Sequence, residues 1–286
     1  MEKHKLKNLF ILCVTALLIV GAAWTIWSNT ALTISSVIVS SDHIPYGFSG
    51  FKIAHVSDLH NAEFGKNNEH LLQLLSESEP DIIVVTGDLV DSNHTDINVA
   101  IEFVKNAALI APVYYVMGNH EARLPEYEEF ENKIELTGTT VLEDEAIQLE
   151  RNGDKIILIG LSDPDFTIKN DVFDEVSAMI DTKLQNLMSA ENEYTILLSH
   201  RPELFETYAS CNADLVFSGH AHGGQFRLPF IGGVIAPNQG LFPKYDSGLY
   251  TKGNTNMIVS RGLGNSIIPI RFNNRPEIVI AELCRK

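Results

Sequence analysis

The chain has 286 residues, of which 45% are hydrophobic and 20% are charged. This composition can bury a substantial core, so it excludes a disordered or low-complexity protein. Lysine and arginine number 21 against 37 aspartate and glutamate residues, and the net charge of -16 argues against nucleic acid as a partner. The three cysteines are too few and too scattered for a disulfide framework or a thiolate zinc site. Any metal must therefore use histidine and carboxylate ligands.

The N-terminal segment is long and apolar. Residues 9–27 carry no charge and end in Trp24 and Trp27, two residues of the type that anchors helices at membrane interfaces. A helix of this length nearly crosses a hydrocarbon layer of about 30 Å. Three lysines lie within the first seven residues, and no Lys or Arg follows the segment closely. The positive-inside bias therefore predicts a single-pass cell-membrane protein, with the N-terminus in the cytoplasm and the remainder extracytoplasmic.

Other interpretations of this segment remain open. A cleaved signal peptide would have an apolar core of roughly 7 to 15 residues followed by a small-x-small exit, but this run is longer. A buried helix of a soluble protein would show a polar face, which is missing. An inverted topology would require the lysine bias to mislead. We expect residues 1–30 to form a basic tip and a transmembrane anchor in the lipid bilayer.

Short apolar runs predict buried strands after the anchor. They cover residues 32–39, 51–57, 81–86, 112–117, 155–160, 194–199 and 214–218. Continuous runs of this kind are typical of sheet strands that are buried on both faces. Apolar residues at three- and four-residue spacing predict helices over 68–79, 98–108 and 171–189. Strand and helix alternate, which indicates an α/β fold.

The last third of the chain changes texture. Residues 223–256 are rich in Gly, Pro and aromatic side chains and too irregular for a helix, so we expect a long functional loop there. Residues 257–262 and 277–283 then predict two closing strands. Since the pattern shows no internal repeat and no second core, residues 31–286 are expected to form one domain.

Histidine, aspartate and asparagine residues cluster directly after the predicted strands, where open α/β sheets bind ligands. They are Asp58, His60, Asp88, Asn119, His120, His200, His220 and His222. A single such histidine is more often a structural or capping residue, and a lone Gly-Asp or Gly-Asn is usually turn chemistry. Five strand ends together, however, offer the oxygen and imidazole ligands that suit Mn, Fe or Zn.

In chain order, the motifs D-x-H, GD, GNHE, a later H and GHxH resemble the signature of the calcineurin-like metallophosphoesterases. The resemblance covers residues 50–286. It implies a two-sheet α-β-β-α sandwich that hydrolyses phosphoric esters with two divalent metal ions. The stretches FKIAHVSDLH, GHAHGGQFRLPF and VSRGLG further resemble the membrane-associated bacterial phosphodiesterase branch typified by YaeI and YkuE.

The resemblance also implies two ligand sets. One metal would be held by Asp58, His60, Asp88 and His222. The second would be held by Asp88, Asn119, His200 and His220, which makes Asp88 the bridging carboxylate. Two cations about 3.5 to 4 Å apart clamp a phosphoryl group and lower the pKa of a shared water, so that the resulting hydroxide attacks phosphorus in line. The ligands do not distinguish Mn, Fe and Zn.

By the same resemblance His120 is the catalytic residue, which stabilises a phosphoryl oxygen or protonates the leaving oxygen. Glu121 either orients the His120 imidazole or caps a helix. Arg201 could neutralise a substrate phosphate, although an arginine paired with carboxylates is commoner. Asp91 either orients a ligand or caps a turn. His55, which lies on a buried strand, is expected to be structural.

These expectations describe a membrane-anchored dinuclear phosphoesterase that acts outside the cytoplasmic membrane on a phosphodiester or pyrophosphate. A predicted strand begins only a few residues after the anchor, which favours a lipid-linked or cell-envelope substrate. Phosphomonoesters, cyclic nucleotides and teichoic-type polymers remain open. The alternative from another class is a catalytically silent, metal-stabilised envelope binding module, against which the intact motifs, including His120, argue.

Overall fold

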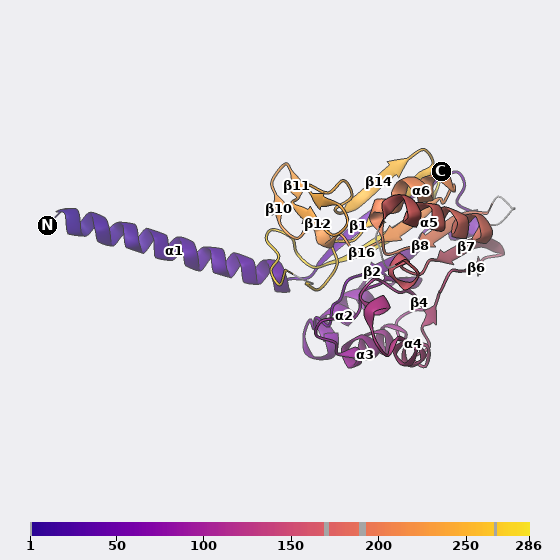
Figure 1. Ribbon diagram of the computed structural model, residues 1–286, viewed down its shortest axis with the longest axis horizontal. Helices are drawn as coiled ribbons and strands as arrows, with labels where there is room; N and C mark the ends of the chain where they lie inside the picture. Colours follow the sequence, from indigo (N-terminus) through magenta and orange to yellow (C-terminus); the bar gives the residue numbers. More distant parts are fainter. Residues whose placement is uncertain (1, 169–171, 189–192, 266–267) are drawn as a thin grey trace.

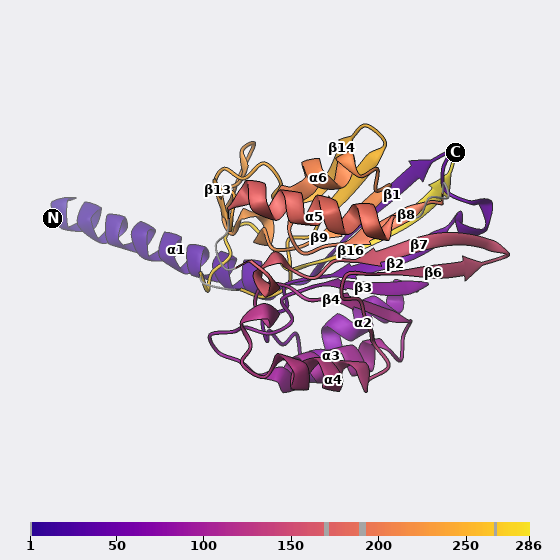
Figure 2. The same cartoon turned by 45° about the vertical axis from the view of Figure 1, so that its right-hand side comes forward.

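The computed structural model describes residues 2–168, 172–188, 193–265 and 268–286. Helix α1 (Glu2–Thr30) projects away from the remainder of the chain, which forms two stacked six-stranded sheets with helices on their outer faces (Figures 1 and 2). The α/β sandwich implied by the sequence motifs is confirmed.

The first sheet has the strand order β1-β16-β2-β3-β4-β5. Its strands are β1 (Thr33–Ser41), β16 (Glu277–Arg285), β2 (Phe51–Val56), β3 (Ile82–Thr86), β4 (Val113–Val116) and β5 (Thr140–Val141). Strands β2 to β5 run parallel, whereas β16 is antiparallel to β2. The carboxyl ends of β2, β3 and β4 therefore lie side by side at the same end of the sheet.

The second sheet has the order β14-β15-β9-β8-β7-β6. Its strands are β14 (Gly248–Lys252), β15 (Thr255–Val259), β9 (Leu215–Ser218), β8 (Thr195–Leu198), β7 (Asp154–Gly160) and β6 (Glu145–Arg151). The four central strands are parallel, and the edge strands β14 and β6 are antiparallel to their neighbours. The carboxyl ends of β8 and β9 also lie side by side at one end of this sheet.

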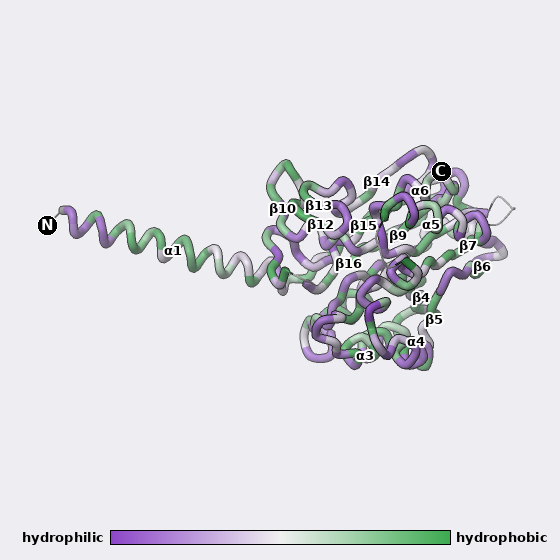
Figure 3. Tube along the Cα trace, viewed as in Figure 1, coloured by the Kyte–Doolittle hydropathy of each residue, from purple (hydrophilic) through white to green (hydrophobic). Residues whose placement is uncertain are grey.

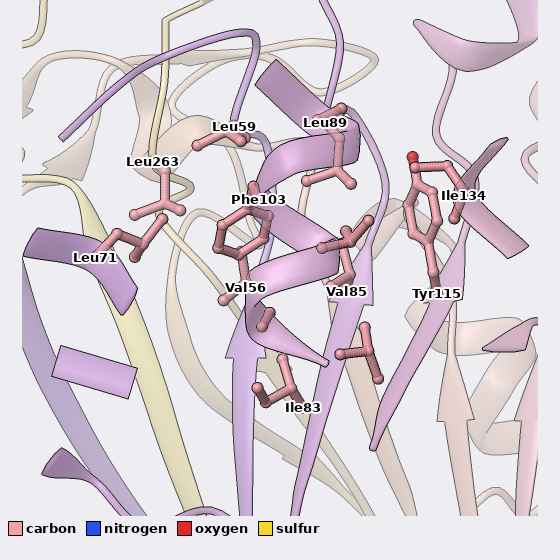
Figure 4. Packing of buried hydrophobic residues seen from close by; sticks show 14 of the residues in the cluster. Val56, Leu59, Leu71, Ile83, Val85, Leu89, Phe103, Tyr115, Ile134 and Leu263 are labelled. Carbon is pink, nitrogen blue, oxygen red and sulfur yellow. The ribbon is translucent and has the colours of Figure 1, made fainter. Parts of the chain in front are cut away.

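Helices cover the outer face of each sheet (Figure 2). Helices α2 (Glu69–Glu77), α3 (Ile97–Ala107) and α4 (Tyr127–Glu135) lie on the first sheet, and α5 (Phe173–Leu187) and α6 (Phe205–Ser210) lie on the second. In Figure 4, Phe103 of α3 packs over Val56 and Val85 of the first sheet. A separate apolar cluster, which includes Ile53 and Phe217, fills the space between the sheets.

The predicted helices and strands are present within a few residues of their expected ends. The stretch 223–256, predicted as a long loop, contains no α-helix but is more ordered than a loop. It includes β14 and the short strands β10 (Arg227–Leu228), β11 (Gly232–Gly233), β12 (Ile235–Ala236) and β13 (Gly240–Leu241). Strand β14 gives no hydrophobic signal because it forms a sheet edge with mostly exposed residues. Its place in the sheet comes from pairing with β15.

The C-terminal end of helix α1 contacts the stretch around Arg271 through hydrogen bonds and a cation–π contact. The Asn29 amide donates to the Arg271 carbonyl at 3.0 Å, and the Arg271 backbone N–H donates back to Asn29 Oδ1 at 2.9 Å. The Arg275 guanidinium lies 4.7 Å from the centre of the Trp27 ring. The helix itself has a mean hydropathy of 2.5 over its most apolar window and buries none of it against the domain.

Candidate metal centre

The sequence-predicted site residues converge at the carboxyl ends of the two sets of parallel strands. Asp58 and His60 follow β2, Asp88 follows β3, and Asn119 and His120 follow β4. His200 follows β8, and His220 and His222 follow β9. All eight residues are at most 6% exposed.

The side chains form three overlapping groups in which one ligand atom per residue lies within 4.8 Å of the others. The groups are Asp58, His60 and His222, then His60, Asp88 and His120, and finally Asp88, His200 and His220. Asp88 and His60 each belong to two groups. Asn119 lies beside the third group, with its Oδ1 atom 3.1 Å from His200 Nε2.

The local backbone at this edge is strained. Five candidate ligands have positive φ between 45° and 63°, and they are Asp58, His60, Asp88, His220 and His222. Residues other than glycine seldom adopt this region, and such strain is concentrated at functional sites. Gly118 allows its loop to approach the Asp88 carboxylate, since a Cβ atom at position 118 would collide with Asp88 Oδ1. The chain thus bends sharply to bring these side chains together.

The group of Asp58, His60 and His222 presents hydrogen-bond acceptors that face one another. His60 Nε2 lies 3.2 Å from His222 Nε2, and Asp58 Oδ1 lies 3.5 Å from the same His222 atom. Burial lowers the pKa of both His60 and His222, which keeps their imidazoles neutral. Neutral imidazole nitrogens facing a carboxylate offer lone pairs to a shared cation. The donor set therefore fits a divalent metal ion.

The group of Asp88, His200 and His220 contains a buried ion pair between Asp88 and His200. His200 Nε2 lies 3.2 Å from Asp88 Oδ2, and His200 Nδ1 donates to the Thr86 carbonyl at 2.6 Å. Although burial alone would lower the pKa of His200, the Asp88 carboxylate raises it to about 10. Burial alone would raise the pKa of Asp88, but His200 holds it well below its usual range. A cation bound here would replace the His200 proton as the partner of Asp88.

The Asn119 amide supports the same assignment. Its Oδ1 atom lies 3.1 Å from His200 Nε2, so the amide oxygen faces the group of Asp88, His200 and His220. A metal ion held by these residues would take the amide oxygen as a ligand, because hard cations prefer oxygen donors.

Glu121 has a role that neither sequence interpretation described. Its buried carboxylate accepts from the backbone N–H groups of Asp88 at 2.8 Å, Gly118 at 2.7 Å and Val90 at 3.2 Å. Burial and the nearby Asp88 carboxylate raise the pKa of Glu121 to about 7. Glu121 thus joins the loop after β3 to the loop after β4, rather than orienting the His120 ring or capping a helix.

His120 is oriented by the loop after β3. Its Nδ1 atom accepts from the Ser92 backbone N–H at 3.0 Å and lies 3.6 Å from Asp91 Oδ1. An Nδ1 acceptor places the proton of the neutral ring on Nε2. Nothing in the sequence singled out Ser92, because a backbone donor leaves no compositional signal.

Arg201 is enclosed by carboxylates. It contacts Asp163 at 2.6 and 2.9 Å and Asp165 at 2.7 Å, and its side chain is 2% exposed. The carboxylate-paired alternative therefore describes Arg201 better than phosphate binding. Arg123, which the sequence did not highlight, pairs with Asp165 at 2.7 Å while 53% of its side chain stays exposed, and it lies beside Asn119.

A two-sheet sandwich with buried histidine and aspartate clusters at its strand ends defines the metallophosphoesterase class. The family model of the calcineurin-like phosphoesterases matches residues 51–224, and the chain belongs to this family of metal-dependent phosphoric ester hydrolases. An uncharacterized metallophosphoesterase of Bacillus subtilis, YkuE, is 31% identical over 250 residues, which span 86% of this chain and 83% of YkuE. The phosphodiesterase YaeI of Escherichia coli is 26% identical and covers 82% of each chain.

Among solved structures, TT1561 of Thermus thermophilus superposes with a TM-score of 0.52 at 14% identity. The match covers 75% of this chain and 91% of that one. At this identity the likeness concerns the fold alone.

Proposed function

We propose that the chain is a membrane-anchored phosphoesterase with two divalent metal ions, which hydrolyses a phosphodiester or pyrophosphate bond. The observation that carries the proposal is the buried Asp88 carboxylate, which groups with His60 on one side and with His200 and His220 on the other. The phosphodiesterase YaeI, a relative over most of its length, favours a diester substrate.

The ligand assignment uses the first and third groups, and Asp88 reaches the first one through His60, whose Nε2 atom lies 3.6 Å from Asp88 Oδ2. Asp58, His60 and His222 would hold one ion, and His200, His220 and Asn119 the other, with Asp88 shared. When bound, divalent ions supply positive charge to the phosphoryl oxygens and lower the pKa of a water molecule. Mn, Fe and Zn are all compatible with this donor set.

His120 would be the catalytic residue, as a proton donor. Because Nδ1 accepts from the Ser92 N–H, the neutral ring carries its proton on Nε2, and this is the proton that would pass to a substrate oxygen. Its ring centre lies 4.5 Å from that of His60, so the donor stands next to the ligand group. A substrate phosphoryl group at the ligands could therefore receive the proton on its leaving oxygen.

Residues 1–30 would be the anchor and residues 31–286 the catalytic domain. The apolar length and solvent-facing surface of α1 support a membrane span. The helix continues to Thr30 and its end is hydrogen-bonded to the domain through Asn29, so an anchor here would join the domain without a long linker. With lysines only on the N-terminal side, the catalytic domain would be extracytoplasmic.

Metal reconstitution tests this function. The full-length protein in detergent is stripped with a chelator, reloaded separately with Mn, Zn or Fe, and assayed with bis-p-nitrophenyl phosphate and p-nitrophenyl phosphate. We expect diester hydrolysis to return with at least one metal. Bound metal without turnover of either ester would favour the catalytically silent binding module.

A further inference from the structure

A group of exposed apolar side chains lies on the segment from β10 to β13 and at Phe272, which pairs with Phe226 at the start of that segment. We call this group the apolar lip, and its members are Leu228, Phe230, Ile231, Leu241, Phe242 and Phe272. The Phe230 side chain at its tip is fully exposed. Single exposed apolar residues need no explanation, but grouped ones mark an interaction surface. Figure 3 shows hydrophobic segments here and next to the base of α1.

Hydrogen bonds join the parts of the lip into one unit. Phe226 and Phe272 form a parallel bridge, and the Arg227 N–H donates to the Phe272 carbonyl at 3.0 Å. Strand β10 pairs with β11, and β12 pairs with β13. The Phe242 N–H donates to the Val234 carbonyl at 2.8 Å, which ties the far end of the segment back to its middle.

The lip is also fixed to the end of α1. Arg271, the neighbour of Phe272, exchanges two hydrogen bonds with Asn29, and Arg275 covers the Trp27 ring. Figures 1 and 2 both place β10 to β13 beside the point where α1 enters the domain. Tryptophans concentrate where a membrane helix leaves the hydrocarbon layer. Trp27 therefore sets the level of the interface close to the lip.

The same segment touches the metal centre. Asn238 Oδ1 lies 3.1 Å from His220 Nε2, and the Asn274 amide donates to the His222 carbonyl at 2.7 Å. Gly224, two residues after His222, packs so closely on Gly233 of β11 that a Cβ atom would collide there. One hydrogen-bonded segment thus connects the exposed lip with two candidate metal ligands.

We infer that the apolar lip inserts into the bilayer beside α1 and holds the metal centre at the level of the lipid headgroups, so that its substrate is a phosphoester carried by a lipid. The inference rests on the proposed function and names its substrate class. The occupant is lipid because the membrane-spanning helix ends at this surface. The whole chain has a net charge of -16, and three of its lysines precede the domain, so the domain is not drawn to anionic lipid and the contact depends on apolar insertion.

The position of the lip can be measured without any catalytic assay. Cys13, Cys211 and Cys284 are replaced by Ser in the full-length chain, and Phe230→Cys is labelled with the fluorophore NBD in phosphatidylcholine vesicles. Leu136→Cys is the control, since Leu136 is 86% exposed and lies between α4 and β5, at the sheet edge opposite to the site. The metal content of each protein reports its folding.

We expect a blue-shifted NBD signal at position 230 that brominated lipid quenches, and no quenching at position 136. Equal, water-like signals at both positions would overturn the inference. A blue shift at 230 that brominated lipid does not quench would also overturn it, because protein, such as a second copy of the chain, would then cover the lip.

The substrate class needs a second measurement in the same vesicles. Hexadecyl p-nitrophenyl phosphate embedded in the bilayer is compared with bis-p-nitrophenyl phosphate in water. The double variant Phe230→Ser with Phe242→Ser should lose about tenfold in the rate on the embedded diester, because less apolar surface enters the lipid. Its rate on the soluble diester should stay unchanged.

The exposed pair Leu109→Ser with Leu136→Ser is the matched control and should change neither rate. Equal losses on both diesters in the Phe230 and Phe242 variant would contradict a lipid-borne substrate. If the wild-type protein hydrolysed neither diester, the proposed function would fail, whereas the NBD measurement would still decide where the lip lies.

Discussion

Asp88 is the residue on which the metal centre depends most. It belongs to two of the ligand groups, and its Oδ1 atom also accepts from the His120 backbone N–H at 2.8 Å. We therefore expect Asp88→Ala to lose both metal ions and all hydrolysis, as measured by elemental analysis and diester assay. Asp96→Asn, which changes an exposed carboxylate at the start of α3, should retain both. Retention of two ions by Asp88→Ala would contradict a shared ligand.

Glu121 stabilises the folded loops after β3 and β4 and has no assigned part in hydrolysis. Glu121→Ala leaves three buried backbone N–H groups without their acceptor. Since each orphaned group costs about 1 to 3 kcal/mol, we expect the free energy of unfolding to fall by about 3 kcal/mol or more. Chemical denaturation of the metal-free protein measures this, with the exposed Glu69→Ala as control. An unchanged midpoint would show that the three hydrogen bonds contribute little.

The sequence indicates the candidate metal ligands better than the residues that hold the ligand loops and the His120 ring in place. Asp58, His60, Asp88, Asn119, His200, His220 and His222 could be chosen because they follow apolar runs whose carboxyl ends meet in an α/β sheet. Ser92 donates its own backbone N–H to His120, and Glu121 accepts from backbone N–H groups of the loop after β3; such pairs leave no trace in the spacing of residues. Their roles depend on how the loops lie in space.

Strand β2 carries a histidine that makes folding depend on pH. His55 Nε2 lies 2.7 Å from Thr86 Oγ1, its ring centre lies 5.1 Å from that of Phe217, and burial lowers its pKa from 6.5 to about 3. Between these values the unfolded chain binds a proton at His55 and the folded chain does not. Its contribution to the free energy of unfolding is therefore complete above pH 6.5 and falls as the pH decreases.

His55→Gln should remove this contribution while keeping an amide near Thr86. Between pH 7 and pH 5, the decrease in unfolding free energy should be about 2 kcal/mol smaller in the variant than in the wild type. Denaturant titrations at both pH values measure it, and the exposed His70→Gln serves as control. Equal decreases in wild type and His55→Gln would show that His55 is protonated in the folded protein.

Elements at the sheet edges were the hardest to predict. The central strands β3 and β9 are buried along their whole length, so their sequences are continuous apolar runs. Strand β6 has no fully buried residue, and α4 buries only Phe130 and Ile134. Neither gives a strong pattern by itself, because pairing with β7 and packing on the first sheet supply most of their stability.

At the scale of the whole molecule, the charge distribution around α1 predicts its orientation. Three lysines precede the apolar segment, and the negative charge of the chain lies after it. We expect alkaline phosphatase fused after Lys286 to be active in cells and a fluorescent protein fused there to be dark, because the fusion point would be extracytoplasmic. The opposite pair of results would place the metal centre in the cytoplasm.

Anchor, apolar lip and metal centre form one continuous assembly at the same end of the domain. The Asn29 contacts join α1 to the stretch around Arg271, and Asn238 joins the lip segment to His220. Movement of the domain relative to the helix would break these contacts. If α1 spans a membrane as proposed, these contacts would hold the metal centre close to the membrane interface instead of on a flexible tether.

The most direct test of the account measures metal content and bis-p-nitrophenyl phosphate hydrolysis side by side, on the full-length wild type and His120→Ala. His120 is assigned as a proton donor, not as a ligand. The account predicts about two ions per chain in both proteins, with turnover reduced by about 100- to 10,000-fold in the variant. Loss of the metal ions from His120→Ala would contradict the division of roles within the metal centre.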